Sequence, residues 1–294
     1  MESYGQQGEE YMKQAAKKLK GGFLKNLFSN KSDRLDEARE LYEQAANSFK
    51  LAKMFERSCE AYMQAAKCEE ESKGDPSNYY MDAAHAQKKA GNMAEFLRIS
   101  DRAINAFCKQ QKISSAARLQ KEIAESLEQG LELEAAAEAY EKAAEFWHLE
   151  DTDTFKNQCL MKSADLSVLS KQENFQKAIL TYERIAKEYL QVKLLQSSAK
   201  DVFLKAGLCY LANDDLVGAQ QAYGDYTNND PSFEHAREGE LLSNVIKMVE
   251  SKDVGGFEKT LHEYNRITPF DKTKTQILTK VKDTITAPPE LDLT

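Results

Sequence analysis

The fold is decided by a short phrase that first appears at residues 41–49 as LYEQAANSF. It returns at residues 61–66 as AYMQAA, at 139–144 as AYEKAA and at 181–186 as TYERIA. In each copy a tyrosine is followed by apolar, mostly small residues three and four positions later, which share one face of a helix. Small side chains there let a neighbouring helix approach closely, while the tyrosine fills the space beside it. Each copy therefore predicts a helix packed tightly against another helix.

Turn-like segments separate these phrases, at residues 73–77, 90–92, 149–153 and 213–215. The resulting unit is a helical hairpin of about 35 to 42 residues, close to the tetratricopeptide period. Residues 77–230 contain no proline that would stop a helix, and alternating Val, Ile and Thr runs typical of strands are missing. The sequence predicts an all-α protein: a right-handed superhelical stack of tetratricopeptide-like hairpins. An ordinary globular helix bundle is the alternative.

After Pro231 the repeated spacing of small residues becomes less regular, which predicts a division of the chain there. We expect the hairpin stack over residues 1–232. Three amphipathic segments, at 233–250, 256–267 and 273–285, predict a helical bundle over residues 233–285 that closes the last hairpin. Residues 286–294 contain two adjacent prolines that exclude a continuous helix, so they are expected to form a flexible tail.

The overall charge excludes some classes of partner. The 294 residues contain 40 basic and 48 acidic side chains, a net charge of −8 at pH 7. Binding to nucleic acid needs a concentrated positive surface, so no nucleic-acid partner is predicted. No run of about 18 apolar residues occurs that could form a transmembrane helix. The N-terminal segment is polar and has no signal-peptide core, which predicts a cytoplasmic protein.

Signals for catalysis or metal binding are weak. Two acid–histidine pairs spaced for one helix face, Asp82 with His85 and Glu145 with His148, resemble half of a di-iron site. They lie about 60 residues apart, in hairpins that a stack would separate. No phosphate-binding glycine loop, zinc motif or nucleophile elbow is present. The sequence therefore predicts no enzyme activity, no cofactor and no metal.

A local reversal of charge stands out near the N-terminus. Residues 11–31 carry six lysines and no acid, and an apolar cluster lies among them. Its members are Phe23, Leu24, Leu27 and Phe28, with Lys25 between them. Preceding glycines place the cluster in a loop, residues 21–31. Apolar side chains ringed by lysines suit an anionic membrane surface, whereas a loop folded back on the first hairpin is the alternative.

Several longer stretches resemble one known family. The most specific are GFLKNLFS at 22–29, AANSFKLAK at 45–53 and SAKDVFLKAGLC at 198–209. The chain resembles the soluble NSF attachment proteins, of the alpha-SNAP type, over essentially its whole length. The resemblance implies a monomeric, peripheral adaptor on the cytosolic face of membranes. Several copies would wrap a SNARE four-helix bundle and recruit the hexameric AAA ATPase NSF, which disassembles the bundle in vesicle fusion and intracellular transport.

The resemblance also implies which residues act. The family's membrane loop matches Phe23, Leu24, Leu27 and Phe28, and its ATPase-stimulating penultimate leucine matches Leu293. The basic SNARE-facing surface of the family matches Lys50, Lys53, Lys88, Lys89, Lys112, Arg118 and Lys162. Candidates for its acidic ATPase-facing end are Asp214, Asp215, Glu250, Asp253, Glu290 and Asp292. Long cationic side chains can hold the acidic outside of a helical rod without specific pockets.

A different class of function is a generic tetratricopeptide scaffold, such as a co-chaperone, that captures an extended peptide tail. That function needs a narrow groove with Lys and Asn side chains repeated at set positions to clamp a carboxylate. No such recurrence is clear in this sequence, and the apolar loop among lysines would have no role.

Overall fold

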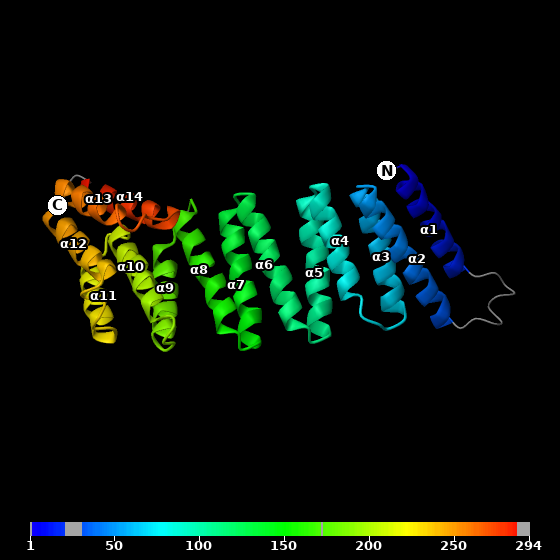
Figure 1. Ribbon diagram of the computed structural model, residues 1–294, viewed down its shortest axis with the longest axis horizontal. Helices are drawn as coiled ribbons and strands as arrows, with labels where there is room; N and C mark the ends of the chain where they lie inside the picture. Colours follow the sequence, from blue (N-terminus) through cyan, green and yellow to red (C-terminus); the bar gives the residue numbers. More distant parts are fainter. Residues whose placement is uncertain (1, 21–30, 172, 287–294) are drawn as a thin grey trace, which may run out of the picture. The chain divides into compact units, whose positions relative to one another are not determined.

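The computed structural model describes residues 2–20, 31–171 and 173–286, which form helices joined by short turns (Figure 1). No strand occurs within these ranges, so the predicted all-α class is confirmed. The helices are α1 (Glu2–Lys20), α2 (Lys31–Leu51), α3 (Phe55–Glu71), α4 (Ser77–Ala90), α5 (Met93–Lys109), α6 (Ile113–Gln129), α7 (Leu133–Leu149), α8 (Asp153–Leu169), α9 (Phe175–Leu190), α10 (Gln196–Ala212), α11 (Leu216–Asn229), α12 (Arg237–Ser251), α13 (Val254–Asn265) and α14 (Lys272–Thr286).

The chain divides into two compact units. The N-terminal unit contains residues 1–123 and 145–152, and the C-terminal unit contains residues 124–144 and 153–294. Within the N-terminal unit α1 packs on α2, α2 on α3, α3 on α4 and α4 on α5. Within the C-terminal unit α8 packs on α9, α9 on α10 and α10 on α11. Consecutive helices joined by short turns run in opposite directions, so the predicted helical hairpins are confirmed.

The tyrosines of the repeated phrase are buried, as the sequence predicts. Tyr42, Tyr62, Tyr140 and Tyr182 are each at most 5% exposed, and the apolar residues three and four positions later are buried beside them. A buried tyrosine hydroxyl needs a hydrogen-bond partner. Three of these tyrosines donate to a polar side chain of the preceding helix: Tyr62 to Asn47, Tyr140 to Glu128 and Tyr182 to Asp165. The repeated motif thus packs two helices closely and gives the buried tyrosine hydroxyl a hydrogen-bond partner.

Most helix ends share one backbone geometry. In the turn after α2, the Lys53 amide donates to the Lys50 carbonyl and the Met54 amide to the Phe49 carbonyl. Lys53 itself has a left-handed conformation with φ of 59°. The same pair of bonds and a positive φ recur after α4, α5, α6, α7, α10 and α12. This arrangement, the Schellman motif, satisfies carbonyls that a helix end leaves without partners.

The four predicted turns are confirmed, but several others were not predicted, among them those at residues 52–54, 110–112 and 130–132. Their left-handed positions hold a lysine, a glutamine and a leucine in place of the glycine that usually marks such a site. Only the turn after α4 uses a glycine, Gly91, among the described residues with positive φ. The missed turns therefore lacked a local sequence signal.

Replacing Leu131 with glycine is expected to stabilise the protein by about 0.5–1 kcal/mol. Leu131 has φ of 61° and is 76% exposed, so its side chain strains the backbone and buries little apolar surface. Thermal unfolding followed by circular dichroism measures the effect. The matched control is Leu180→Gly, a leucine that is 61% exposed in the interior of α9, which should lower the midpoint. A lower midpoint for Leu131→Gly would contradict the reading of strain.

The three helices predicted after residue 233 are present as α12, α13 and α14. The first begins at Arg237 because two short turns precede it, in which Phe233 donates to the Asp230 carbonyl and Ala236 to the Phe233 carbonyl. Phe233 is buried against Phe203 and Tyr226, with ring centroids 5.8 and 6.0 Å away. This aromatic cluster attaches the segment after Pro231 to α10 and α11. The predicted boundary at residues 232 and 233 stays a prediction.

Two buried lysines connect α14 to the helices before it. Lys205 in α10 lies 2.9 Å from Asp165 in α8 and 3.6 Å from Asp271, which precedes α14. Lys274 in α14 lies 2.5 Å from Asp201 in α10 and 3.6 Å from the same Asp271. The two lysine side chains are only 8% and 7% exposed. This network ties α8, α10 and α14 together inside the C-terminal unit.

Candidate partner-binding surfaces

Phe23, Leu24, Lys25, Leu27, Phe28, Glu290, Asp292 and Leu293 lie outside the described residues. Lys31, expected at the end of the loop, is instead the first residue of α2. The helical part of the chain therefore resumes at once after residue 30.

Three of the predicted SNARE-facing cations lie on one edge of the N-terminal unit. Lys50 is in the last turn of α2, Lys53 is in the turn after it, and Lys89 is in the last turn of α4. Helices α2 and α4 both run antiparallel to α3, so their ends lie at the same edge, which we call the Lys50 edge (Figure 1). All three side chains are exposed, and none forms an ion pair with a described residue. They are available for an acidic partner.

Lys88 differs from its neighbour Lys89 because it is engaged within the protein. Its ammonium lies 2.9 Å from Glu122 of α6 and 5.2 Å from the centre of the Phe96 ring. Glu122 also contacts His85 of α4, with 2.9 Å between the carboxylate and Nε2. Hydrogen bonds from His85, and then from Lys88, lower the pKa of Glu122 to about 2. The contacts of Glu122 attach α6 to α4.

Replacing Glu122 with glutamine is expected to remove roughly 1–2 kcal/mol of stability at neutral pH, after discount for partial exposure. The pKa is about 2 in the folded protein and 4.5 as a free side chain. The carboxylate therefore stabilises the fold above pH 4.5, and its contribution disappears as pH falls toward 2. Urea unfolding at several pH values measures the difference between the two proteins. A difference that does not shrink in this pH window would contradict the assignment.

Lys112 lies on the opposite edge of the N-terminal unit. It sits in the turn between α5 and α6, and its ammonium is 2.5 Å from Asp75 in the turn between α3 and α4. Burial alone would raise the pKa of Asp75, but hydrogen bonds from Lys112 and Ser77 outweigh burial and lower it. We call this side, with the turns at 72–76 and 110–112, the Asp75 edge. The predicted cations of this unit therefore do not form one continuous group.

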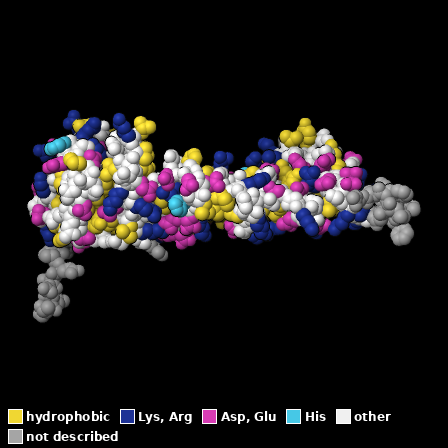
Figure 2. All heavy atoms as spheres, turned by 90° about the horizontal axis from the view of Figure 1, so that it is seen from below, with side chains coloured by type: hydrophobic (Ala, Val, Ile, Leu, Met, Phe, Trp, Pro, Cys, Tyr) yellow, Lys and Arg dark blue, Asp and Glu magenta, His cyan; other side chains and the backbone are white. Residues whose placement is uncertain are grey.

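The remaining two predicted cations are exposed on helix surfaces. Arg118 is in α6 and forms no ion pair with a described residue. Lys162 in α8 lies 3.0 Å from Glu128. Figure 2 shows basic and acidic side chains interleaved over the face it displays, without one broad patch of a single sign. An acidic partner would therefore be held by local groups of cations.

The predicted acidic residues of the C-terminal unit share one edge. Asp214 and Asp215 are in the turn between α10 and α11, and Asp253 follows α12. Helices α10 and α12 run in the same direction, since α11 lies between them in the chain and packs on both. Glu250, in the last turn of α12, lies 3.5 Å from Gln220 in the second turn of α11 and thus joins the two turns. We call this group the acidic edge.

Two members of the acidic edge have a structural role that the sequence reasoning missed. Asp215 accepts a hydrogen bond from the Gly218 amide at 2.7 Å and is the N-cap of α11. Asp253 accepts one from the Gly256 amide at 2.9 Å and is the N-cap of α13. An aspartate at the N-cap position commonly accepts a hydrogen bond from the backbone amide three residues later. The negative charges at this edge are therefore held in defined positions.

The described residues contain no group of three or more His, Cys, Asp or Glu side chains that could hold a metal ion. None of the described helices is long and apolar enough to cross a membrane.

Comparison with known proteins gives consistent matches. A family described as "Soluble NSF attachment protein, SNAP" matches residues 6–286. The chain is 34% identical over 284 residues to the alpha-soluble NSF attachment protein of Vitis vinifera, covering 96% of this chain and 95% of that protein. It is 32% identical over 292 residues to the Homo sapiens protein of that name, covering 97% of each. A probable vesicular-fusion protein sec17 homolog of Schizosaccharomyces pombe is 33% identical, covering 94% of this chain and 96% of its own length.

Proposed function

Because the chain belongs to the soluble NSF attachment protein family, we propose that it attaches the ATPase NSF to SNARE complexes. It is an adaptor for NSF-mediated SNARE disassembly in vesicle fusion. The observation that carries this function is the match over residues 6–286, supported by relatives that align along almost their entire length. The adaptor hydrolyses nothing itself, and it needs no cofactor.

The Lys50 edge is the part of the N-terminal unit best suited to an acidic helical rod. Its exposed lysines lie at the ends of α2 and α4, and none of them forms an ion pair with a described carboxylate. Arg118 adds an exposed cation from α6, whereas Lys88, Lys112 and Lys162 are already paired with carboxylates. A lysine that is already paired contributes less binding free energy to a partner, because its existing ion pair must first be weakened. We assign the larger share of SNARE contact to the unpaired cations.

Replacing Lys53 and Lys89 together with glutamate is expected to weaken SNARE binding about tenfold at low salt. The two new carboxylates would repel an acidic bundle, and the difference should shrink as salt is added. Pull-down with an assembled SNARE complex over a series of salt concentrations measures this effect. Lys109→Glu, an exposed lysine at the end of α5 on the Asp75 edge, is the matched control. Equal binding by the double variant and the control would exclude the Lys50 edge.

The acidic edge is proposed to face the ATPase. Asp214 and Glu250 are exposed, and the capping bonds of Asp215 and Asp253 fix where their charges lie. Glu290, Asp292 and Leu293 would extend this contact beyond α14. The chain acts as a monomer before assembly, and several copies join one SNARE bundle.

The membrane contact is proposed for residues 21–31, with Phe23, Leu24, Leu27 and Phe28 as the inserting side chains and Lys25 beside them. They would place the adaptor at the cytosolic face of a membrane as a peripheral protein. Such an anchor combines apolar insertion with attraction between lysines and anionic lipid.

A further inference from the structure

The turn between α2 and α3 exposes two apolar side chains that its backbone does not require. Leu51, the last residue of α2, is 63% exposed, and Met54, which follows the left-handed Lys53, is 40% exposed. Turns of the same geometry after α4, α5, α6 and α12 hold polar residues at the position of Leu51, namely Lys89, Lys109, Gln129 and Glu250. Those after α4, α5, α6, α7, α10 and α12 hold polar residues at the position of Met54, namely Asn92, Lys112, Glu132, Thr152, Asp215 and Asp253.

Met54 also leaves α3 without a capping side chain. It occupies the N-cap position of α3 and forms no side-chain hydrogen bond there. At the same position before α5, α11 and α13, Asn92, Asp215 and Asp253 each accept a hydrogen bond from the backbone amide three residues later. Such a cap stabilises a helix, and methionine cannot supply it. Proteins tend to depart from local rules of this kind at functional sites.

The start of α1 adds a third exposed apolar side chain at this end of α2. Gly5 of α1 faces the turn closely, since a β-carbon at that position would lie 2.9 Å from the Met54 sulfur. Tyr4, the residue before Gly5, is 46% exposed. The contact with Gly5 holds Met54 against α1 while part of its side chain stays open to solvent. We call Tyr4, Leu51 and Met54 together the Leu51 patch.

An unpaired cation adjoins the Leu51 patch. Lys53 lies within the same turn, is exposed, and forms no ion pair with a described residue. Lys50 is less free, because it offsets part of the rise that burial causes in the pKa of Asp82 of α4. Glu56, in the first turn of α3, is exposed and forms no ion pair with Lys53. Apolar and cationic side chains side by side suit a partner surface that is both acidic and apolar.

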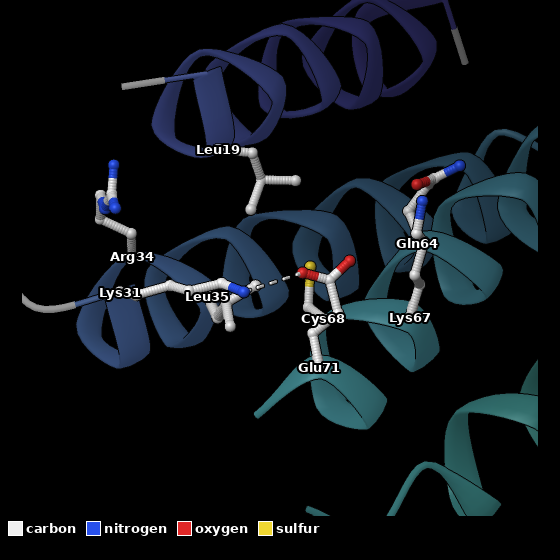
Figure 3. A pocket seen from close by; sticks show the side chains of 8 residues that line it. All are labelled: Leu19, Lys31, Arg34, Leu35, Gln64, Lys67, Cys68 and Glu71. Carbon is white, nitrogen blue, oxygen red and sulfur yellow. Dashed lines mark ion pairs between the residues drawn. The ribbon is translucent and has the colours of Figure 1, made fainter. Parts of the chain in front are cut away.

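The opposite end of α2 is arranged differently. Leu35 is buried there, and Figure 3 shows Leu19 pointing from α1 toward α2. Lys31 lies 3.9 Å from Glu71 of α3, so this lysine has a carboxylate partner (Figure 3). Exposed apolar side chains beside an unpaired cation are therefore a feature of the end of α2 that belongs to the Lys50 edge.

We propose that the Leu51 patch is an apolar contact for an acidic helical rod, the SNARE bundle, and adds a salt-resistant part to its binding. The inference rests on the proposed function and deepens it. Lys53 and Lys89 supply an attraction that salt screens, whereas Leu51 and Met54 supply apolar burial that salt does not screen. The surface of the bundle that meets this patch must then carry an apolar side chain beside its acids.

An anionic membrane would also accept apolar and cationic side chains together. The position of the patch favours the bundle. Leu51 and Lys31 are the two ends of the 21-residue helix α2, so the patch lies about 30 Å from the residue at which the proposed membrane contact ends. The patch is instead continuous with the cations of the Lys50 edge.

Titration of the full chain against an assembled SNARE complex without vesicles, followed by fluorescence anisotropy, tests the proposal. Leu51→Gln with Met54→Asn gives this turn polar residues found after α6 and α4, and should weaken binding about tenfold. The same factor should persist at high salt, whereas the loss caused by Lys53→Glu with Lys89→Glu should shrink. Unchanged binding by the apolar double variant, or a loss that disappears at high salt, would overturn the proposal.

The matched control is Leu149→Gln. Leu149 occupies the position of Leu51 in the turn after α7, belongs to the same unit and is 70% exposed. This variant should bind the SNARE complex as the native chain does. A loss equal to that of the double variant would mean that the position of an exposed leucine does not matter, and would overturn the assignment to the Lys50 edge.

The apolar variants are chosen to keep the fold. Met54→Asn supplies α3 with the capping side chain that it lacks, and Leu51→Gln introduces a residue of good helix propensity. Far-UV circular dichroism should show native helicity. Leu51→Gln alone keeps the contact of Met54 with Gly5 and should weaken binding about threefold at every salt concentration. Native binding by this single variant would remove Leu51 from the contact and overturn the proposal.

Two further measurements test other occupants of the patch. Flotation with anionic vesicles should be the same for the native chain and the apolar double variant, and a loss confined to vesicles would contradict a bundle and assign the patch to a membrane. Sedimentation velocity should give a monomer for both, and self-association that only the native chain shows would assign the patch to a second copy instead. If the native chain fails to bind the SNARE complex, the proposed function falls together with this inference, whereas native binding that the double variant retains overturns this inference alone.

Discussion

Replacing Asp165 with alanine is expected to lower the free energy of unfolding of the C-terminal unit by about 3 kcal/mol. Asp165 accepts hydrogen bonds from the Lys205 ammonium at 2.9 Å and the Tyr182 hydroxyl at 2.6 Å. Burial alone would lower the pKa of Lys205, but the carboxylates of Asp165 and Asp271 outweigh burial and raise it. The variant would therefore leave a charged, buried ammonium with Asp271, 3.6 Å away, as its remaining ion-pair partner among the described residues.

Urea unfolding followed by far-UV circular dichroism measures this loss. Asp225→Ala, an exposed aspartate of α11, is the control and should change stability by less than about 0.5 kcal/mol. Asp165→Asn keeps an acceptor for the Tyr182 hydroxyl, so its free energy of unfolding should lie between those of Asp165→Ala and the control. Equal stability of Asp165→Ala and the control would mean that the network does not hold α8, α10 and α14 together.

Replacing Phe23 and Phe28 together with serine is expected to weaken binding to anionic vesicles by about 100-fold or more. Each phenylalanine buried in the membrane interface contributes roughly 1.5–3 kcal/mol, and tenfold in affinity corresponds to about 1.4 kcal/mol. The lysines around the loop would remain, so a residual, salt-sensitive binding should persist. Vesicle flotation measures both the loss and its salt dependence.

The control for this experiment is Leu194→Ser, which removes an apolar side chain that is 89% exposed elsewhere in the chain. It should leave vesicle binding unchanged. Unchanged binding by the double variant would remove the membrane role of residues 21–31. It would also leave the alternative, a loop that packs on the first hairpin, as the better account.

The hairpin fold could be predicted because its signal is local. A tyrosine followed by small residues at one helical spacing reports close packing of a helix face, and Tyr62, Tyr140 and Tyr182 are buried accordingly. Turns that contain Gly, Pro or clustered Asp were also predicted. The turns at Lys53, Gln111 and Leu131 were missed because backbone hydrogen bonds of the Schellman motif hold ordinary residues in a left-handed conformation there, without the glycine that usually marks it.

The burial and ion pairing of individual lysines could not be predicted from the sequence. Lys205 and Lys274 read as ordinary surface lysines, since only the packing of α14 on α8 and α10 buries them. Similarly, the resemblance selected Lys50 and Lys112 as one set, but alternation of helix direction puts them on opposite edges of the N-terminal unit. Whether a lysine already has a carboxylate partner depends on contacts about 35 residues away, as with Lys88 and Glu122.

ATP-driven disassembly of a SNARE complex is the decisive assay for an adaptor that couples such complexes to NSF. A SNARE four-helix bundle labelled with a fluorescent pair is mixed with NSF and ATP, with and without the chain. We expect the labels to separate only when the chain is present, and no ATP hydrolysis by the chain alone. Disassembly at the same rate without the chain, or none with it, would contradict the assignment.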